Sequence, residues 1–114
     1  MGDGWETRRR REPGHDWLII KLGKKSFLTK AEIDTAFFKG NYPESCSIQA
    51  INTDDISKVK DEDWLTIIPK SILHADKVHK FSIRTKFHSI EFSHIKLNIF
   101  PDGGVSRLRI FGHI

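Results

Sequence analysis

Short runs of alternating apolar residues, separated by turn-forming residues, constrain this chain more than any other feature. A strand points every second side chain to the same face, whereas a surface helix repeats its apolar residues about every three to four positions. The 114 residues show hardly any helical periodicity. Strands are predicted at residues 17–22, 27–35, 45–51, 64–68, 77–85, 92–100 and 105–111. We therefore expect an all-β fold of one domain, an antiparallel β-sandwich.

The last two predicted strands are separated only by the turn-forming residues 101–104. This spacing predicts a β-hairpin in which Phe100 pairs with Val105. The register places Leu97 and Leu108 on one apolar face. The opposite, polar face then carries Asn98, Arg107 and Arg109. In the same way, segments 17–22 and 27–35 are expected to pair as neighbours around a turn at residues 23–26.

A charged segment precedes the first predicted strand. Residues 3–16 hold four consecutive arginines, four carboxylates and His15, with Trp5 inside the segment and Trp17 at its end. Two glycines and a proline predict a loop over residues 1–16. Polar groups on a loop beside a buried strand are the usual layout of a binding or catalytic site. A solvated, charge-balanced surface loop is the alternative for the same composition.

Charge and composition argue against several function classes. The net charge of +4 is mild, and Glu6 and Glu12 flank the arginine run, so a nucleic-acid partner is not expected. No apolar run approaches the roughly 18–20 residues of a membrane span, so no membrane partner is expected either. The single cysteine, Cys46, fits a reducing intracellular compartment, the cytoplasm, with a peroxisomal location left open. The histidines lack zinc-site spacing, so no cofactor is expected, although a divalent metal is left open.

Several blocks of the sequence resemble the allantoicase family. They are DGWETRRRR (3–11), GHDW (14–17), IDT (33–35), FKGNYP (38–43), SIQA (47–50) and LNIFPDGGVSRLR (97–109). Family members usually carry two repeats, and this chain resembles one incomplete repeat over residues 1–114. The resemblance implies a jelly-roll, galactose-binding-like sandwich over residues 17–114 behind a charged site loop at 1–16. It also implies a partner, either a second repeat or another copy of the chain.

The resemblance further implies hydrolysis of allantoate to ureidoglycolate and urea, a step of allantoin and purine catabolism. Such a site needs a cation for the carboxylate, amides for the ureido groups and an acid or base for proton transfer. The acid–base candidates are Glu6, His15, Asp16 and Asp34. The substrate-binding candidates are Arg8, Arg9, Arg10, Asn41, Asn98, Arg107 and Arg109.

The first loop and the polar face of the last hairpin are expected to form a single pocket for an anionic substrate. As one isolated repeat, the chain could still be inactive. The alternative, from another class, is a non-catalytic sandwich module that binds a small polar ligand or a protein partner.

Overall fold

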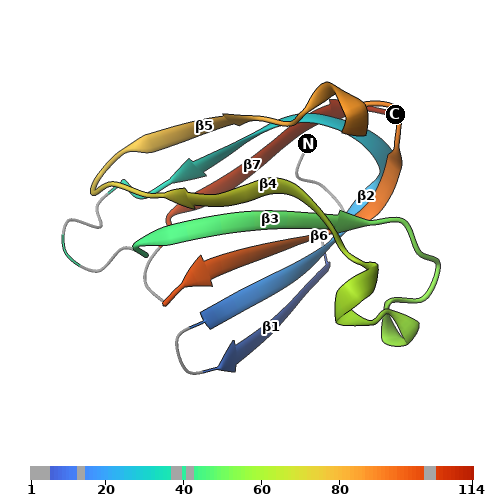
Figure 1. Cartoon of the computed structure of the whole chain (residues 1–114), viewed down its shortest axis with the longest axis horizontal. Coiled ribbons are helices and arrows are strands. Elements are labelled where there is room, and N and C mark those ends of the chain that lie inside the picture. Colours follow the sequence, from blue (N-terminus) through green and yellow to red (C-terminus); the bar gives the residue numbers. More distant parts are fainter. Residues whose placement is uncertain (1–5, 13–14, 37–39, 41–42, 102–104) are drawn as a thin grey trace.

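The computed structural model describes residues 6–12, 15–36, 40, 43–101 and 105–114. These residues form strands and three short 3-10 helices, and no α-helix occurs among them (Figure 1). The strands are β1 (Glu6–Glu12), β2 (His15–Asp34), β3 (Ser45–Ile51), β4 (Leu65–Ile72), β5 (Val78–Ser82), β6 (Glu91–Phe100) and β7 (Arg107–His113). The 3-10 helices are η1 (Ile56–Lys58), η2 (Asp61–Asp63) and η3 (Thr85–Phe87). All the pairings are antiparallel, which confirms the prediction of an antiparallel all-β fold.

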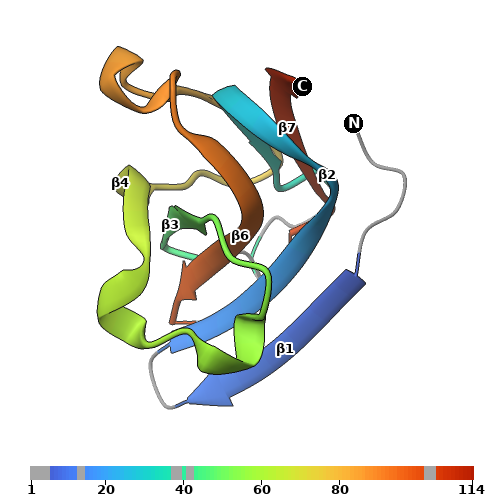
Figure 2. The same ribbon diagram turned by 90° about the vertical axis from the view of Figure 1, so that its right-hand side faces the viewer.

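The long strand β2 belongs to both layers of the sandwich. Its first part pairs with β1 on one side and β6 on the other, giving a first layer in the order β1-β2-β6-β3-β4. Its second part pairs with β5 and β7, which gives a second layer in the order β5-β2-β7. Figure 2 shows the strand curving from one layer into the other. The register with β6 shifts between Lys21 and Ser26, where the strand leaves the first layer.

The predicted turn at residues 23–26 is therefore wrong. Segments 17–22 and 27–35 do not pair with each other, because both lie in the continuous strand β2. Gly23 and Lys24 are exposed where the strand crosses between layers. Small and charged residues suit a bend of this kind as well as they suit a reverse turn, so local composition does not distinguish the two.

The predicted C-terminal hairpin is also wrong. Strand β6 pairs with β2 and β3, so that Leu97 faces Leu18 on one side and Ile48 on the other. Strand β7 pairs with the second part of β2, where Leu108 faces Ile33. Each of the two strands has the expected alternation. Alternation determines which face of a strand is apolar, but it does not determine which strand pairs with it.

The apolar core lies between the two layers. Leu28, Ile33, Ile95 and Ile110 are buried there, together with Phe92. Alternate residues face the core in β3, where Cys46, Ile48 and Ala50 are buried, and in β5 and the residues after it, where His79 and Ile83 are buried. Burial raises the pKa of the Cys46 thiol to about 11.

The arginine run forms a strand, which corrects the prediction of a loop over residues 1–16. In β1, Arg8 pairs with Ile19 and Arg10 with Trp17. Strand β1 is the first of its layer and has β2 as its only strand partner among the described residues. Charged residues are tolerated, and even favoured, on an edge strand. Their presence therefore does not argue against strand structure.

A polar segment connects β3 to β4 and carries η1 and η2. Its start is fixed to β6, because the backbone N–H of Thr53 donates to Ser93 Oγ at 2.8 Å. Asp55 caps η1 by accepting from the backbone N–H of Ser57 at 3.0 Å. Most of residues 52–63 are exposed, as the polar and acidic composition of this segment predicts. Strand β4 continues past Pro69 to Ile72, because the proline is exposed on a terminal strand of its layer.

Candidate functional site

The outer face of the first layer carries buried polar side chains. Ile95 and Leu97 of β6 enter the core, so the alternate residues His94, Lys96 and Asn98 lie on the outer face. These three side chains are nevertheless only 6%, 8% and 3% exposed. An outer sheet face normally leaves its polar groups in water. This face is instead covered, and its polar groups are arranged by neighbouring side chains.

A hydrogen-bonded chain crosses three adjacent strands of this face. Asn98 Nδ2 in β6 donates to Gln49 Oε1 in β3 at 3.0 Å. Asn98 Oδ1 lies 2.8 Å from His15 Nε2 at the start of β2. The imidazole of His15 stacks on Phe100, with ring centroids 4.6 Å apart, and is tilted against Trp17 at 5.1 Å. The histidine is therefore held by one polar contact and two aromatic contacts.

The Asn98 amide selects a tautomer of His15. Because Asn98 Nδ2 already donates to Gln49, the oxygen faces His15, and the proton between them belongs to His15 Nε2. In the neutral imidazole, Nδ1 then carries the lone pair. His15 is thus oriented as a group that can accept a proton and return it, which is the requirement for general acid–base chemistry.

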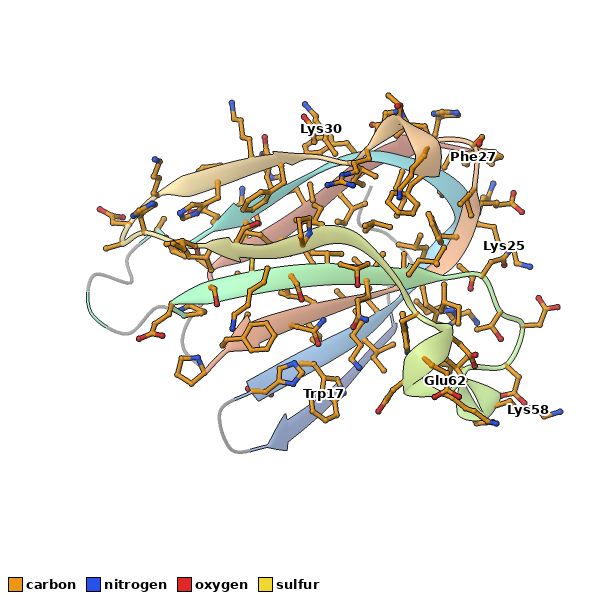
Figure 3. The ribbon with its side chains drawn as sticks, viewed as in Figure 1. Trp17, Lys25, Phe27, Lys30, Lys58 and Glu62 are labelled. Atoms are coloured by element: carbon orange, nitrogen blue, oxygen red, sulfur yellow. The ribbon has the colours of Figure 1, made fainter. Side chains whose placement is uncertain are left out.

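Lys96 lies beside this row of hydrogen-bonded side chains and was not predicted from the sequence as a site residue. Its Nζ is 5.0 Å from the ring centroid of Trp17 and 5.7 Å from that of Trp64. Trp17 comes from β2, and Trp64 is the residue immediately before β4. Figure 3 shows Trp17 over the first layer, on the side of the molecule away from Lys30.

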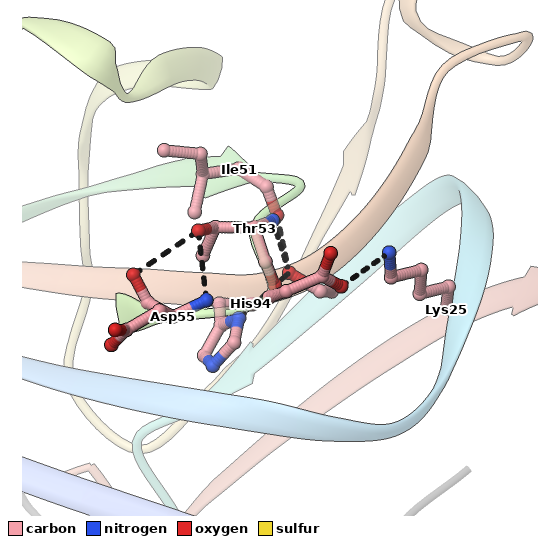
Figure 4. Close-up of polar contacts among 7 residues, drawn as sticks. Lys25, Ile51, Thr53, Asp55 and His94 are labelled. Carbon is pink, nitrogen blue, oxygen red and sulfur yellow. Dashed lines mark hydrogen bonds and ion pairs between the residues drawn. The ribbon is translucent and has the colours of Figure 1, made fainter. Parts of the chain in front are cut away.

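A pocket of about 390 Å³ opens farther along the same face, between β2 and the segment that follows β3. Lys25 Nζ closes one side through an ion pair with Asp54 Oδ1 at 3.0 Å. Within the lining, Ser93 Oγ lies 2.7 Å from His94 Nδ1 and donates to the backbone oxygen of Thr53 at 3.0 Å. Figure 4 shows the contacts that join β2 and β6 to the segment after β3. Basic and acidic side chains both line the pocket, so it suits a small ligand that has both charged and hydrogen-bonding groups.

The prediction that Asn98, Arg107 and Arg109 share one polar face is wrong. In β7 the core residues are Leu108 and Ile110, so the two arginines lie on the outer face of the second layer, where both are exposed. Arg109 lies 3.9 Å from the Glu32 carboxylate of β2. The two arginines and Asn98 thus lie on opposite outer faces of the sandwich, and one small ligand cannot contact both. The error follows from the wrong hairpin.

The acid–base candidates of β2 lie apart from one another. Asp16 is 2% exposed and lies on the opposite face of β2 from its neighbour His15. Asp34 ends the strand: its Oδ1 accepts from the backbone N–H of Ala36 at 2.7 Å, and its backbone oxygen accepts from Ser106. The contact between Asp34 Oδ1 and the backbone N–H of Ala36 is that of an Asx turn. Of these three residues, His15 is the one whose hydrogen bond with Asn98 places it in the polar face of the first layer.

The remaining candidates lie in β1 or outside the described residues. The backbone of β1 places Glu6 opposite Lys21, Arg8 opposite Ile19, Arg9 opposite Leu18 and Arg10 opposite Trp17. Asn41 lies outside the described residues. Within the described ranges, no three His, Cys, Asp or Glu side chains gather as metal ligands. No helix in that part of the chain is long and apolar enough to span a membrane.

The two antiparallel layers that share β2 give the chain the fold of a galactose-binding-like β-sandwich. A solved structure of XRCC1 superposes on 89% of this chain, with a TM-score of 0.72 and 10% sequence identity. It also resembles a chitosan-binding module from Paenibacillus, with a TM-score of 0.61 and 16% identity. At these identities the likeness concerns the fold alone.

The chain belongs to the allantoicase family, because the family model described as Allantoicase repeat matches residues 1–114. It is 51% identical to the allantoicase of Dictyostelium discoideum, covering 96% of this chain and 31% of that protein. It is 46% identical to a probable allantoicase of Rhizobium meliloti, and the match covers 100% of this chain and 36% of that protein. The solved allantoicase of Saccharomyces cerevisiae superposes with a TM-score of 0.74 at 40% identity, and the match covers 99% of this chain and 32% of that protein. The chain therefore spans about a third of the length of these relatives.

Proposed function

We propose that this chain is a working repeat of an allantoicase, which hydrolyses allantoate to ureidoglycolate and urea. The observation that carries the proposal is the His15–Asn98–Gln49 chain on the outer face of the first layer, in a protein of this family. Two amide side chains and an oriented imidazole match the groups that a ureido-bearing substrate requires.

The reaction breaks one bond between the central carbon of allantoate and a ureido nitrogen, and a water oxygen takes the place of that nitrogen. One proton leaves the water, and one joins the departing urea. We assign the proton transfer to His15, whose Nδ1 carries the lone pair in the tautomer that Asn98 selects. The amides of Asn98 and Gln49 are assigned to the ureido groups.

The carboxylate of allantoate needs a cation. Arg107 and Arg109 are on the other layer, so the arginines left for this role are Arg8, Arg9 and Arg10. Among these arginines, Arg8 and Arg10 fit the role better than Arg9, because they pair with Ile19 and Trp17 of β2, whereas Arg9 pairs with Leu18, which packs on the core. We keep Glu6 and Asn41 as further candidates for proton transfer and ureido binding, and assign no catalytic role to Asp16 or Asp34.

A second repeat, or a second copy of this chain, is proposed to complete the enzyme. The support is that relatives about three times as long carry the same family name. We further propose a cytoplasmic location, since the single cysteine is buried and needs no oxidising compartment.

The experiment that tests the function measures urea release from allantoate by the whole chain over a range of protein concentrations. We expect His15→Gln to lower kcat by about 10²–10⁴, the usual contribution of a general acid or base. The matched control is His113→Gln, because His113 also stacks on an aromatic ring, Phe27, at 5.4 Å, but in the second layer. A chain that neither binds allantoate nor releases urea, or a His15→Gln variant with wild-type kcat, would overturn the proposal.

A further inference from the structure

The environment of Lys96 is unusual for a lysine. The side chain is 8% exposed, and lysine is almost never so buried unless a charged partner accompanies it. Among the residues whose side chains the structure describes, which excludes those of β1, no carboxylate lies within ion-pair distance of its Nζ. The closest compensation is aromatic: the ring centroids of Trp17 and Trp64 lie 5.0 and 5.7 Å from Nζ. Indole faces attract an ammonium group but do not neutralise its charge.

The position of Lys96 relates it to the amides of the site. Lys96 and Asn98 are two residues apart on one face of β6, so their Cα atoms are about 7 Å apart. Gln49 pairs with Lys96 across the strands and also accepts the hydrogen bond from Asn98. A cation and two amides are thus presented side by side on one covered surface. A small ligand with an anionic group and a neighbouring amide-like group can contact the cation and the amides together.

We propose that Lys96, in place of the arginines of β1, anchors the carboxylate of the ligand between Trp17 and Trp64, while Asn98 and Gln49 hold the adjacent ureido group. The site then selects small α-ureido carboxylates. This inference deepens the proposed function and rests on it for the identity of the reaction, but it concerns binding and has its own readout. The anion supplies the negative charge that the described surroundings of Lys96 lack, and the two indoles exclude water around the pair.

Binding to the whole chain tests the anchor, with tryptophan fluorescence or calorimetry as the readout. The probes are N-carbamoylglycine, which has one carboxylate and one ureido group, and its uncharged amide. We expect the amide to bind roughly 10- to 150-fold more weakly, the loss that corresponds to one charge-assisted hydrogen bond. Equal affinity for the two probes, or no binding of N-carbamoylglycine, would overturn the anchor without the need for any variant.

Variants distinguish recognition of the anion from a structural role. Lys96→Met should remove the preference for N-carbamoylglycine over its amide and leave the melting temperature unchanged or higher, because it removes a buried charge and keeps an apolar stem. Lys96→Arg should keep part of the preference. The matched control is Lys30→Met, because Lys30 Nζ also lies over a ring, that of Phe111 at 4.5 Å, but is exposed on the second layer. A folded Lys96→Met variant with the wild-type preference would refute the inference.

The anchor and the hydrolase proposal can fail separately. If the chain binds N-carbamoylglycine through Lys96 but releases no urea from allantoate at any protein concentration, the anchor stands and the hydrolase proposal fails. If Lys96→Met hydrolyses allantoate with the wild-type KM, the anchor fails and the hydrolase proposal stands.

Discussion

Asn98→Ala should destabilise the chain by about 1–3 kcal/mol. Asn98 is 3% exposed and makes two side-chain hydrogen bonds, to Gln49 at 3.0 Å and with His15 at 2.8 Å. A hydrogen bond between neutral groups contributes a net of about 0.5–1.5 kcal/mol to stability, so the loss of both gives the stated range. The effect is larger than for an exposed asparagine because Gln49 Oε1 loses the donor that Asn98 supplies.

The free energy of unfolding can be measured by urea denaturation, followed through tryptophan fluorescence. With an m-value of about 1–3 kcal/mol/M, the midpoint should fall by roughly 1 M urea. Asn52→Ala is the matched control, because Asn52 is exposed at the start of the segment after β3. It should stay within about 0.5 kcal/mol of the wild type.

A double-mutant cycle identifies the bond responsible. Gln49→Ala combined with Asn98→Ala should show a coupling energy of about 0.5–1.5 kcal/mol, because the two residues share one hydrogen bond. If Asn98→Ala were as stable as Asn52→Ala, or if the two changes were simply additive, the polar chain would not exist in solution and the assignment of the His15 tautomer would lose its basis.

Three further predictions concern the core and its edges. Leu97→Ala should cost about 2–5 kcal/mol in denaturant unfolding and Lys58→Ala less than about 0.5, and equal losses would mean that the core is misplaced. Gly112→Ala should lower stability by about 1–3 kcal/mol or more, because its Cβ would lie 2.0 Å from the backbone oxygen of Phe27; an unchanged melting temperature would contradict this. Since burial raises the pKa of Cys46 to about 11, the native thiol should resist alkylation at pH 8. Its contribution to stability should be constant below pH about 9 and fall as the pH rises to about 11, a fall that Cys46→Ala should abolish.

The fold class could be predicted from sequence because alternation is a local property of each strand. The pairing could not, because it depends on which strands meet across the whole chain. Leu97 and Leu108 both enter the core, as their alternation indicates, but they do so from opposite layers. The polar stretch after Leu22 has the composition of a turn, whereas the structure uses it to bend one long strand.

Part of the candidate site could also be predicted from the sequence. His15 and Asn98 belong to the blocks that carry the family resemblance, and the structure brings them into contact. Gln49 lies in such a block too, but its role depends on β3 pairing with β6, which the sequence did not predict. Lys96 has the appearance of a solvent-facing residue in an alternating strand. Its burial depends on Trp17 and Trp64, from segments far away in the sequence, so only the folded structure reveals it.

The sharing of β2 by both layers has a consequence for synthesis. The strand is complete when residue 34 has been made, but its pairing with β6 and β7 waits for residues 91–113. At about 5–20 residues per second, the roughly 80 residues from the end of β2 at residue 34 to the end of β7 at residue 113 take a ribosome about 4–16 s. Throughout that interval the nascent chain presents a 20-residue strand with β-branched and aromatic residues and one or both edges open. We therefore expect holding chaperones to bind the region of β2 first, and co-translational aggregation to rise when translation slows between β2 and β6.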